Sequence, residues 1–337
     1  MKHYSLFAAV LALILAVSCG PSKIDKAFDA YVAAFQADSQ DVHSMIILKD
    51  GKILKEAYFS EGAADKPHVL HSCSKTFTSI AVGFAVSEGL LTVDDKVISF
   101  FPDDLPEEIS ENLAAMTVKD LLTMTCGHDR EAPGVRTSED WVKGFLAFPV
   151  EHTPGTYYVY NSLGTFMLSA IVQKLTGEKI VDYLYPRFFE PLGIDYPKWE
   201  ESPLGINCGG WGLYLKTMDL AKTGQCILQG GMYDGKQVIP AEWVSEMTRR
   251  QVDSYPSGCR PEEAEAKGLT PETSQWRLGY GYQMWRCPHN AVRADGANGQ
   301  YIFVMPEQNA VVAMTAYCPD MQSESDLMWE YIFPALN

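Results

Sequence analysis

The stretch Ser72-Cys73-Ser74-Lys75 opens a segment whose apolar side chains recur at helical spacing. Phe77, Ile80 and Phe84 lie three or four positions apart and Gly89 ends the pattern, so the sequence predicts a helix over 72–88. Residues three apart on a helix share one face, with Cβ atoms roughly 5–6 Å apart. The stretch therefore predicts a hydroxyl and an amine side by side in the first turn of this helix.

This pair of side chains suits nucleophilic catalysis. A serine hydroxyl is a weak nucleophile until a base takes its proton. A lysine in a partly desolvated pocket has a lowered pKa and can be that base, and the helix start offers a backbone N–H to developing negative charge. The alternative is an N-cap serine beside a solvated lysine, since about one Ser-x-x-Lys is expected by chance in a chain of this length. Ser72 is the candidate nucleophile and Lys75 the candidate base.

A second candidate region runs from Pro154 to Ser162. Pro154-Gly155 makes a turn, and the aromatic run after it delivers Tyr160 just before an apolar helical stripe. A tyrosine near a cationic lysine can have a lowered pKa and relay protons, which makes Tyr160 the third catalytic candidate. The alternative is that Tyr160 is an aromatic residue at the edge of the core.

The third region is Ala294-Asp295-Gly296-Ala297, just before a strand-like run at Tyr301. A glycine at a strand edge permits close backbone approach. The amide of Ala297 can then join that of Ser72 as the second donor of an oxyanion hole. The alternative is a plain β-turn. Trp285, Arg286 and His289 precede this region, and the sequence leaves open whether they line a pocket or pack in the core.

Strand-like runs lie at both ends of the chain, with helical patterns between them. A sheet is predicted from 40–70 and 279–317, and a mainly helical region from about 90 to 250, so the sheet joins distant parts of the chain. The acidic, proline-containing stretch 256–272 is predicted as a surface loop. The expected strands are 44–48, 53–59, 279–286, 301–305 and 310–316, and the other expected helices are 25–36, 163–175, 218–228, 241–249 and 326–333.

Composition excludes several function classes. The 337 residues are 47% apolar with a net charge of −16, so the chain can bury a large core and has no general field that would attract nucleic acid. Neither a Gly-x-Ser-x-Gly nor a His-Glu-x-x-His motif occurs. Seven cysteines follow Cys19 without a Cys-x-x-Cys pair, which gives no support for a zinc site; Cys259 and Cys287 are one possible disulfide. We expect no cofactor and no metal.

The three regions, in this order, resemble the serine β-lactamase and penicillin-binding transpeptidase superfamily. The likeness is greatest to the class C β-lactamase branch, with its esterases and D-aminopeptidases, and spans roughly 42–315. Besides the regions already quoted it rests on Thr76-Phe77-Thr78, Leu121-Leu122-Thr123-Met124-Thr125-Cys126-Gly127, Gly209-Gly210-Trp211-Gly212-Leu213 and Gly279-Tyr280-Gly281-Tyr282.

The resemblance implies an α/β fold, with an antiparallel sheet flanked by helices and an inserted helical subdomain. It also implies an acyl-enzyme on Ser72 and hydrolysis of a small-molecule or short-peptide ester or amide. The alternatives are a true β-lactamase or D-Ala peptidase, and a catalytically inactive lipoprotein that binds peptidoglycan. The presence of Ser72, Lys75 and Tyr160 together argues against the inactive protein.

Two departures from the family pattern concern substrate binding. The usual Tyr-x-Asn is Tyr160-Asn161-Ser162 here, so Ser162 is expected to bind a substrate carbonyl or Lys75. The third motif usually carries a cation and a hydroxyl before its glycine, whereas this chain has Ala294-Asp295-Gly296. We therefore place Asp295 and Gly296 in the substrate site and expect Asp295 to disfavour a carboxylate-bearing substrate, without compensation from Arg293. The same departures argue against β-lactamase and D-Ala-D-Ala carboxypeptidase activity.

The N-terminus has the pattern of an export signal. Lys2 precedes a nearly continuous apolar run over 6–17, which is too short to span a bilayer. A small residue then stands directly before Cys19, as in the lipobox of bacterial lipoproteins. We expect a signal peptide over 1–18, lipidation of Cys19, a hydrolase domain over 20–337, and attachment to a bacterial membrane facing the periplasm or the cell surface. The alternative is ordinary secretory cleavage.

Overall fold

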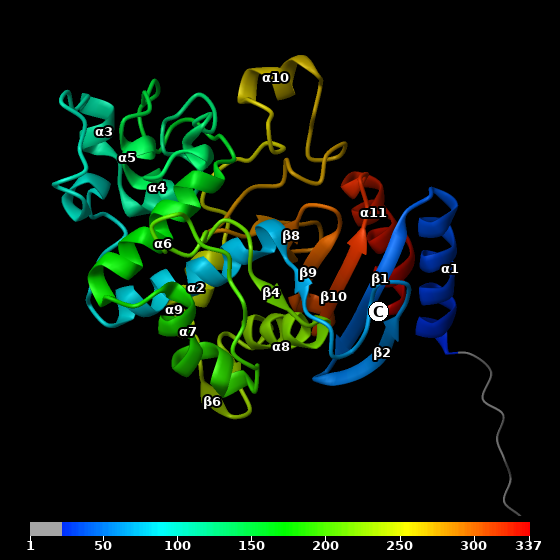
Figure 1. The fold of residues 1–337 in the computed structure, drawn as a ribbon. Coiled ribbons are helices and arrows are strands. Elements are labelled where there is room, and N and C mark those ends of the chain that lie inside the picture. The colour runs from blue at the N-terminus through cyan, green and yellow to red at the C-terminus, as the bar shows by residue number, and fades with distance from the viewer. Residues whose placement is uncertain (1–21) are drawn as a thin grey trace, which may run out of the picture.

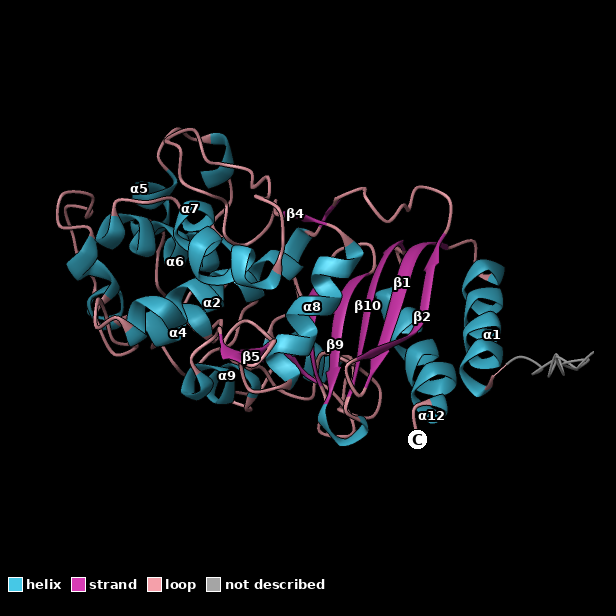
Figure 2. Cartoon of the chain, turned by 90° about the horizontal axis from the view of Figure 1, so that it is seen from below, coloured by secondary structure: helices cyan, strands magenta, loops and turns pink. Residues whose placement is uncertain are grey.

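The computed structural model describes residues 22–337, and its centre is a six-stranded sheet in the order β2-β1-β10-β9-β8-β7 (Figure 2). All neighbouring pairs in this sheet are antiparallel, and β1 lies between β2 and β10, so the two ends of the chain meet in its middle. The predicted α/β fold with an antiparallel sheet is confirmed. The strands are β1 (Asp41–Lys49), β2 (Lys52–Tyr58), β7 (Trp285–Arg286), β8 (Val292–Gly296), β9 (Gln300–Met305) and β10 (Ala310–Tyr317).

Helices cover both faces of the sheet, which agrees with the apolar runs 45–48 in β1 and 301–305 in β9. In β1, Met45 and Ile47 pack on the N- and C-terminal helices, while Ile46 and Leu48 face the larger core of the helical region. The first face is covered by α1 (Lys23–Ala37), α11 (Met321–Leu327), η7 (Met328–Ile332) and α12 (Phe333–Ala335); α8 (Thr217–Leu228) covers the second (Figure 1).

The helical region is built around α2 (Ser74–Ser87) and α6 (Ser162–Thr176), which pack on each other. Both are buried along most of their length because their side chains belong to the larger core. The remaining helices are α3 (Glu111–Ala115), α4 (Val118–Leu122), α5 (Trp141–Leu146), α7 (Ile180–Leu184), α9 (Ala241–Thr248) and α10 (Pro261–Ala266). Two small sheets pair β3 (His68–Val69) with β4 (Tyr214–Leu215), and β5 (Met232–Tyr233) with β6 (Lys236–Gln237).

Two segments differ from the sequence prediction. Of the expected strand 279–286, only Trp285–Arg286 joins the main sheet, because Gly281 packs against the end of α9: a Cβ there would lie 2.1 Å from the Met247 carbonyl oxygen. The predicted surface loop 256–272 contains α10, which begins with Pro261 at its first position and whose Glu263 carboxylate accepts the Arg260 backbone N–H at 3.3 Å.

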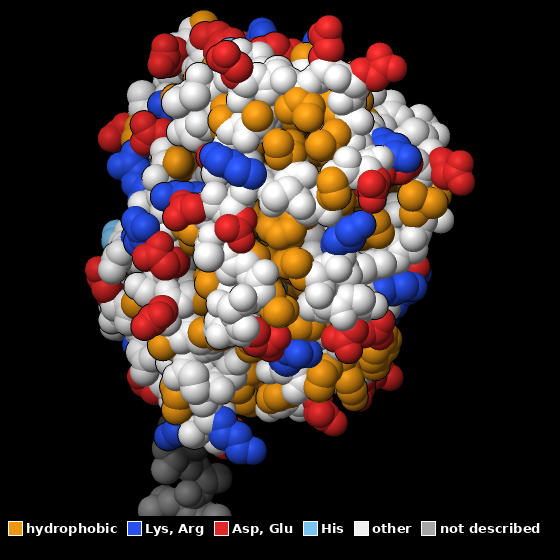
Figure 3. Space-filling view, turned by 90° about the vertical axis from the view of Figure 1, so that its left-hand side faces the viewer, with side chains coloured by type: hydrophobic (Ala, Val, Ile, Leu, Met, Phe, Trp, Pro, Cys, Tyr) orange, Lys and Arg blue, Asp and Glu red, His pale blue; other side chains and the backbone are white. Residues whose placement is uncertain are grey.

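The surface and the cysteines add three facts. On the face shown in Figure 3, acidic and basic side chains are interspersed around a band of hydrophobic ones. Between residues 22 and 337 no helix has the length and hydropathy needed to cross a membrane. All seven cysteines in that range are buried and unpaired, so Cys259 and Cys287 do not form the disulfide that the sequence allowed.

Candidate active site

Ser72 lies in a single 3-10 turn, η1 (His71–Cys73), and α2 begins only at Ser74. His71, with φ of 46°, adopts the left-handed conformation that starts this turn. The Ser74 hydroxyl donates to the His71 carbonyl at 2.7 Å and accepts from the Leu213 amide at 3.1 Å. These contacts fix the backbone on both sides of Ser72. The α-helix thus starts at Ser74, two residues later than the sequence pattern predicts.

Lys75 is buried beneath Ser72 with 1% of its surface exposed. Its Nζ lies 3.1 Å from Ser72 Oγ, 3.0 Å from Ser162 Oγ and 2.7 Å from the Gly210 carbonyl oxygen. Burial lowers the pKa of Lys75 from 10.5 to about 7, because the charged form loses its hydration. The amine therefore reaches its neutral, proton-accepting form near neutral pH, which a solvated lysine does not.

Two charges that the sequence motifs do not include also act on Lys75. The Glu131 carboxylate accepts the Ser162 N–H at 2.7 Å and pairs with Arg136, whose guanidinium lies 4.0 Å from the Trp211 ring centroid. After burial, these are the largest influences on the Lys75 pKa: Glu131 raises it and Arg136 lowers it. The sequence pointed to neither, because Glu131 lies in a loop, Arg136 lies in the short 3-10 helix Val135–Thr137, and neither belongs to a motif.

Tyr160 is half-buried beside Ser72 and Lys75. Its ring stacks on Trp285 at 5.5 Å between centroids, and Lys75 Nζ lies 4.8 Å from the ring centroid. Burial and then the Asp295 carboxylate raise the pKa of Tyr160 well above its usual value, and the neighbouring Ser72 hydroxyl offsets only part of this rise. The lowered pKa expected for Tyr160 is therefore wrong. Its phenol keeps its proton at neutral pH and can donate it.

Gly296 brings the end of β8 against the turn that carries Ser72. A Cβ at this position would lie 2.1 Å from the Leu70 carbonyl oxygen and 3.0 Å from the Cys73 amide nitrogen, so only glycine fits. Ala297 follows and lines the same cavity as Ser72. The predicted close backbone approach is present, and its cause is packing against η1.

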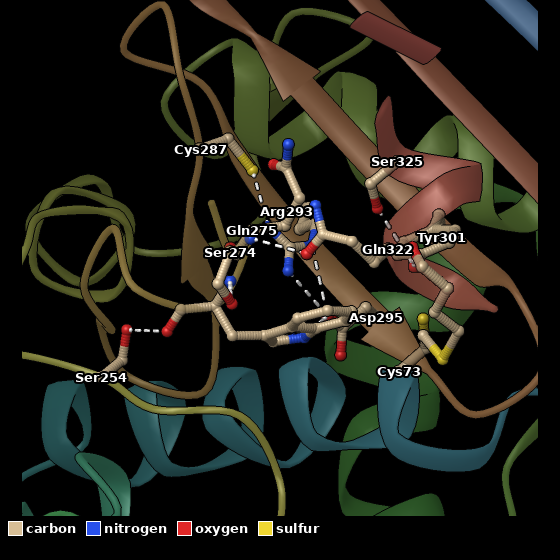
Figure 4. A network of polar contacts seen from close by, with 12 residues as sticks. Cys73, Ser254, Ser274, Gln275, Cys287, Arg293, Asp295, Tyr301, Gln322 and Ser325 are labelled. Atoms are coloured by element: carbon tan, nitrogen blue, oxygen red, sulfur yellow. Dashed lines mark hydrogen bonds and ion pairs between the residues drawn. The ribbon is translucent and has the colours of Figure 1, made fainter. Parts of the chain in front are cut away.

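Asp295 differs most from its sequence-based interpretation. Its Oδ2 accepts from Arg293 Nε at 3.2 Å and from the Trp276 indole N–H at 3.0 Å, in the network of Figure 4. The expectation that Arg293 would not compensate Asp295 is wrong, because residues two apart on a strand point to the same face. The side chains of Asp295 and Arg293 are 7% and 0% exposed, so the two residues form a buried ion pair.

A cavity of about 370 Å³ opens beside the nucleophile. A second hollow of about 440 Å³ shares Tyr160 and Ser257 with it. The sequence left open whether three residues line a pocket or pack in the core. Trp285 lines the cavity, whereas Arg286 donates to the Thr248 carbonyl and His289 stacks on a core phenylalanine. The cavity is lined by Ser72, Tyr160, Pro256, Ser257, Trp276, Trp285, Asp295, Ala297, Pro319, Asp320 and Met321.

Comparison with known proteins agrees with this arrangement. The model of the beta-lactamase family matches residues 24–336. The chain belongs to the beta-lactamase family. Its relatives include the 6-aminohexanoate-dimer hydrolase of Paenarthrobacter ureafaciens, 26% identical over 302 residues that cover 82% of this chain and 73% of the relative. The predicted superfamily is confirmed, and this beta-lactamase family member is a serine hydrolase.

Solved structures show the same fold at low sequence identity. A family VIII carboxylesterase superposes with a TM-score of 0.70 at 16% identity, over 94% of this chain and 98% of the esterase. A penicillin-binding protein homologue from Caulobacter crescentus gives a TM-score of 0.70 at 15% identity, over 94% and 98% of the two chains. Proteins with several different names therefore share this fold.

Proposed function

We propose that this protein cleaves a small ester or amide, a short peptide included, in two steps through an acyl-enzyme on Ser72. The observation that carries the proposal is the buried Lys75 amine, 3.1 Å from Ser72 Oγ and with a pKa of about 7. Neutral Lys75 takes the Ser72 proton as Oγ attacks the substrate carbonyl carbon. The bond to the leaving group then breaks as Tyr160 donates its proton to that group, and the Lys75 ammonium returns a proton to Tyr160. Water then attacks the carbonyl carbon of the acyl-enzyme, which releases the acid and restores the Ser72 hydroxyl.

Stabilisation of the tetrahedral oxyanion is assigned to the backbone amides of Ser72 and Ala297. This assignment is supported by the position of Gly296, which lets β8 approach η1 closely enough for both residues to line one cavity. One such donor contributes about 3–4 kcal/mol to transition-state stability. Besides substrate and water, the proposed reaction uses only side chains and backbone of this chain.

Ser162 is assigned to positioning as well as substrate binding. Its hydroxyl lies 3.0 Å from Lys75 Nζ, and its own amide is held by Glu131 at 2.7 Å. Together with the Gly210 carbonyl, Ser162 directs the Lys75 amine toward Ser72. A substrate carbonyl that accepts from the same hydroxyl would be oriented by an already fixed group.

The substrate class draws support from similar proteins. One relative is named 6-aminohexanoate-dimer hydrolase, and one structural neighbour is named a family VIII carboxylesterase. The absence of a cation and a hydroxyl before Gly296 disfavours β-lactams and D-Ala-D-Ala peptides, whose carboxylate such groups receive in the resembling families. An ester or amide without a carboxylate beside the scissile bond is therefore the expected substrate.

The test compares phenyl acetate with a chromogenic cephalosporin and a D-Ala-D-Ala peptide. Wild-type protein should hydrolyse the ester and neither of the others at a comparable kcat/KM. Ser72→Ala should abolish ester hydrolysis, whereas the control Ser87→Ala, at the far end of α2, should retain it. Ester hydrolysis by Ser72→Ala within tenfold of wild type would disprove the proposal, and preferential turnover of the cephalosporin would identify a true β-lactamase.

We also propose that the enzyme is exported and anchored to a bacterial membrane through a lipid on Cys19. Residues 1–18 and Cys19 lie outside the described part of the structure, so this proposal rests on the sequence pattern alone. Each buried CH₂ of an acyl chain adds about 0.8 kcal/mol to membrane binding, which several chains make firm. Cys19→Ala should release the protein from the membrane fraction of the producing bacterium. Wild-type protein found entirely in the soluble fraction would contradict the proposal.

A further inference from the structure

The cavity beside Ser72 has an unusual combination of walls. Tyr160, Trp276 and Trp285 supply aromatic rings, and Asp295 and Asp320 supply carboxylates. Among the described residues that line it, none is a lysine or an arginine. Arg293 already lies over the Trp276 and Trp285 rings, 5.5 and 5.8 Å from their centroids, and Trp285 also stacks on Tyr160. The carboxylates of the lining, rather than its aromatic faces, would therefore attract a further cation.

Asp295 presents one occupied and one open oxygen. Its Oδ2 receives the Trp276 indole N–H at 3.0 Å and Arg293 Nε at 3.2 Å. Within residues 22–337 no recorded hydrogen bond reaches Oδ1, although the side chain is only 7% exposed and lines the cavity. Oδ1 is not among the buried polar atoms of these residues that lack a partner, so it is accessible from the cavity. The open Oδ1 therefore points to a donor that comes with the substrate.

Arg293 pairs with Asp295 and weakens this preference, but it is not among the residues that line the cavity. It is 0% exposed, and its NH1 donates to the Gln275 carbonyl at 3.1 Å. A donor at Oδ1 would thus contact the carboxylate directly and the guanidinium only across it. Since Coulomb energy falls with distance, the nearer negative charge dominates.

The aromatic wall is held in place before any ligand binds. The Gln275 backbone N–H donates to Gln322 Oε1 at 3.0 Å, and the Trp276 backbone carbonyl accepts from Ser254 Oγ at 2.7 Å (Figure 4). With the indole N–H bound to Asp295, both ends of Trp276 are fixed. A preorganised wall lowers the entropic cost of binding.

We propose that this cavity is a subsite for a protonated primary amine of the substrate. The ammonium donates to Asp295 Oδ1, and Asp320, whose Oδ1 accepts the Ser323 N–H at 3.1 Å, adds a second negative charge to the lining. The inference deepens the proposed function by giving its substrate a cationic amino group near the scissile bond. It rests on that function only in that Ser72 lines the same cavity.

Ligand binding to the Ser72→Ala protein tests the subsite without turnover. The probes are n-hexylammonium, 1-hexanol and hexanoate, followed by tryptophan fluorescence, since two of the walls are indoles. The Kd of n-hexylammonium should be at least tenfold lower than that of 1-hexanol, a difference of about 1.4 kcal/mol, and hexanoate should bind most weakly. Equal or tighter binding of the alcohol or the carboxylate would overturn the proposal, whatever the behaviour of any further variant.

Three variants test which carboxylate produces the preference for the amine over the alcohol. Asp295→Asn should reduce the amine-over-alcohol ratio to below about threefold, Asp320→Asn should reduce it partly, and the control Asp195→Asn, on an exposed carboxylate lining another hollow, should leave it unchanged. An Asp295→Asn protein that keeps its native circular dichroism and the full ratio would overturn the assignment. If the amine binds as expected while wild-type protein cleaves no ester, the proposed function fails and the subsite stands.

Discussion

Lys75 should set the pH dependence of catalysis. Burial lowers its pKa from 10.5 to about 7, so about half of the protein carries the neutral amine at pH 7. At the ordinary pKa only roughly one molecule in 3,000 would do so, which makes burial worth roughly three orders of magnitude in competent base. The value of kcat/KM for a neutral ester should therefore level off above pH 7 and fall about tenfold per pH unit well below it.

The fall of kcat/KM below pH 7 is the acid limb of the pH profile. Two variants should shift this acid limb in opposite directions. Glu131→Gln removes a carboxylate that raises the Lys75 pKa, and therefore the limb should shift to lower pH. Arg136→Gln removes a cation that lowers it, and therefore the limb should shift to higher pH. Because both side chains are partly exposed to solvent, at 29% and 45%, we expect shifts of a few tenths to about one pH unit. Glutamine keeps an oxygen that can accept the Ser162 N–H, so the backbone there should be preserved.

The assay is titration of the acid released from phenyl acetate at constant pH between 5 and 9, with the exposed Glu107→Gln as the control variant. The control should leave the wild-type profile unchanged. A wild-type profile that stays flat from pH 5 to 8 would refute the role of Lys75 as base. Shifts of the same sign in Glu131→Gln and Arg136→Gln would refute the electrostatic account of its pKa.

Three further variants test other parts of the account. Tyr160→Phe should lower kcat/KM at least about 100-fold, and its effect should not add to that of Lys75→Ala if the two form one relay; a double variant that shows the product of both losses would disprove the relay. Gly296→Ala should cost about 1–3 kcal/mol of the free energy of unfolding and reduce kcat, because its Cβ would lie 2.1 Å from the Leu70 carbonyl oxygen; unchanged urea unfolding and kcat would contradict this packing. Burial raises the pKa of Glu324 from 4.5 to about 8, so the folded state binds the proton more tightly and the free energy of unfolding should fall between pH 4.5 and 8, by up to about 1.4 kcal/mol per pH unit. Glu324→Gln should remove this fall, and equal slopes in urea unfolding of the two proteins over pH 5–8 would contradict it.

Local patterns predicted much of the fold. The expected strands 44–48 and 310–316 correspond to β1 and β10, and the expected helix 218–228 corresponds to α8, because periodicity and turn residues act over short stretches of chain. The segment 279–286 was predicted less well. Its β-forming residues are held by packing against α9, a contact that residue type alone does not encode.

Some features of the active site could also be predicted from the local sequence, whereas others depend on the fold. The spacing of Ser72 and Lys75 predicted their proximity because one helical turn sets it, and the glycine at 296 predicted close backbone approach. The contacts of Lys75 with Gly210 and the influence of Glu131 depend on segments far away in sequence, which meet only in the folded chain. The pairing of Arg293 with Asp295 could have been predicted from the sequence, because residues two apart on a strand point to the same face.

The most direct test of the central claim is the intact mass of the protein after reaction with a fluorophosphonate. The account predicts one adduct per chain, mapped by peptide mass spectrometry to the segment that contains Ser72, absent from Ser72→Ala and formed much more slowly in Lys75→Met. A label on any other residue, equal labelling of Ser72→Ala, or no label on folded wild-type protein would contradict it.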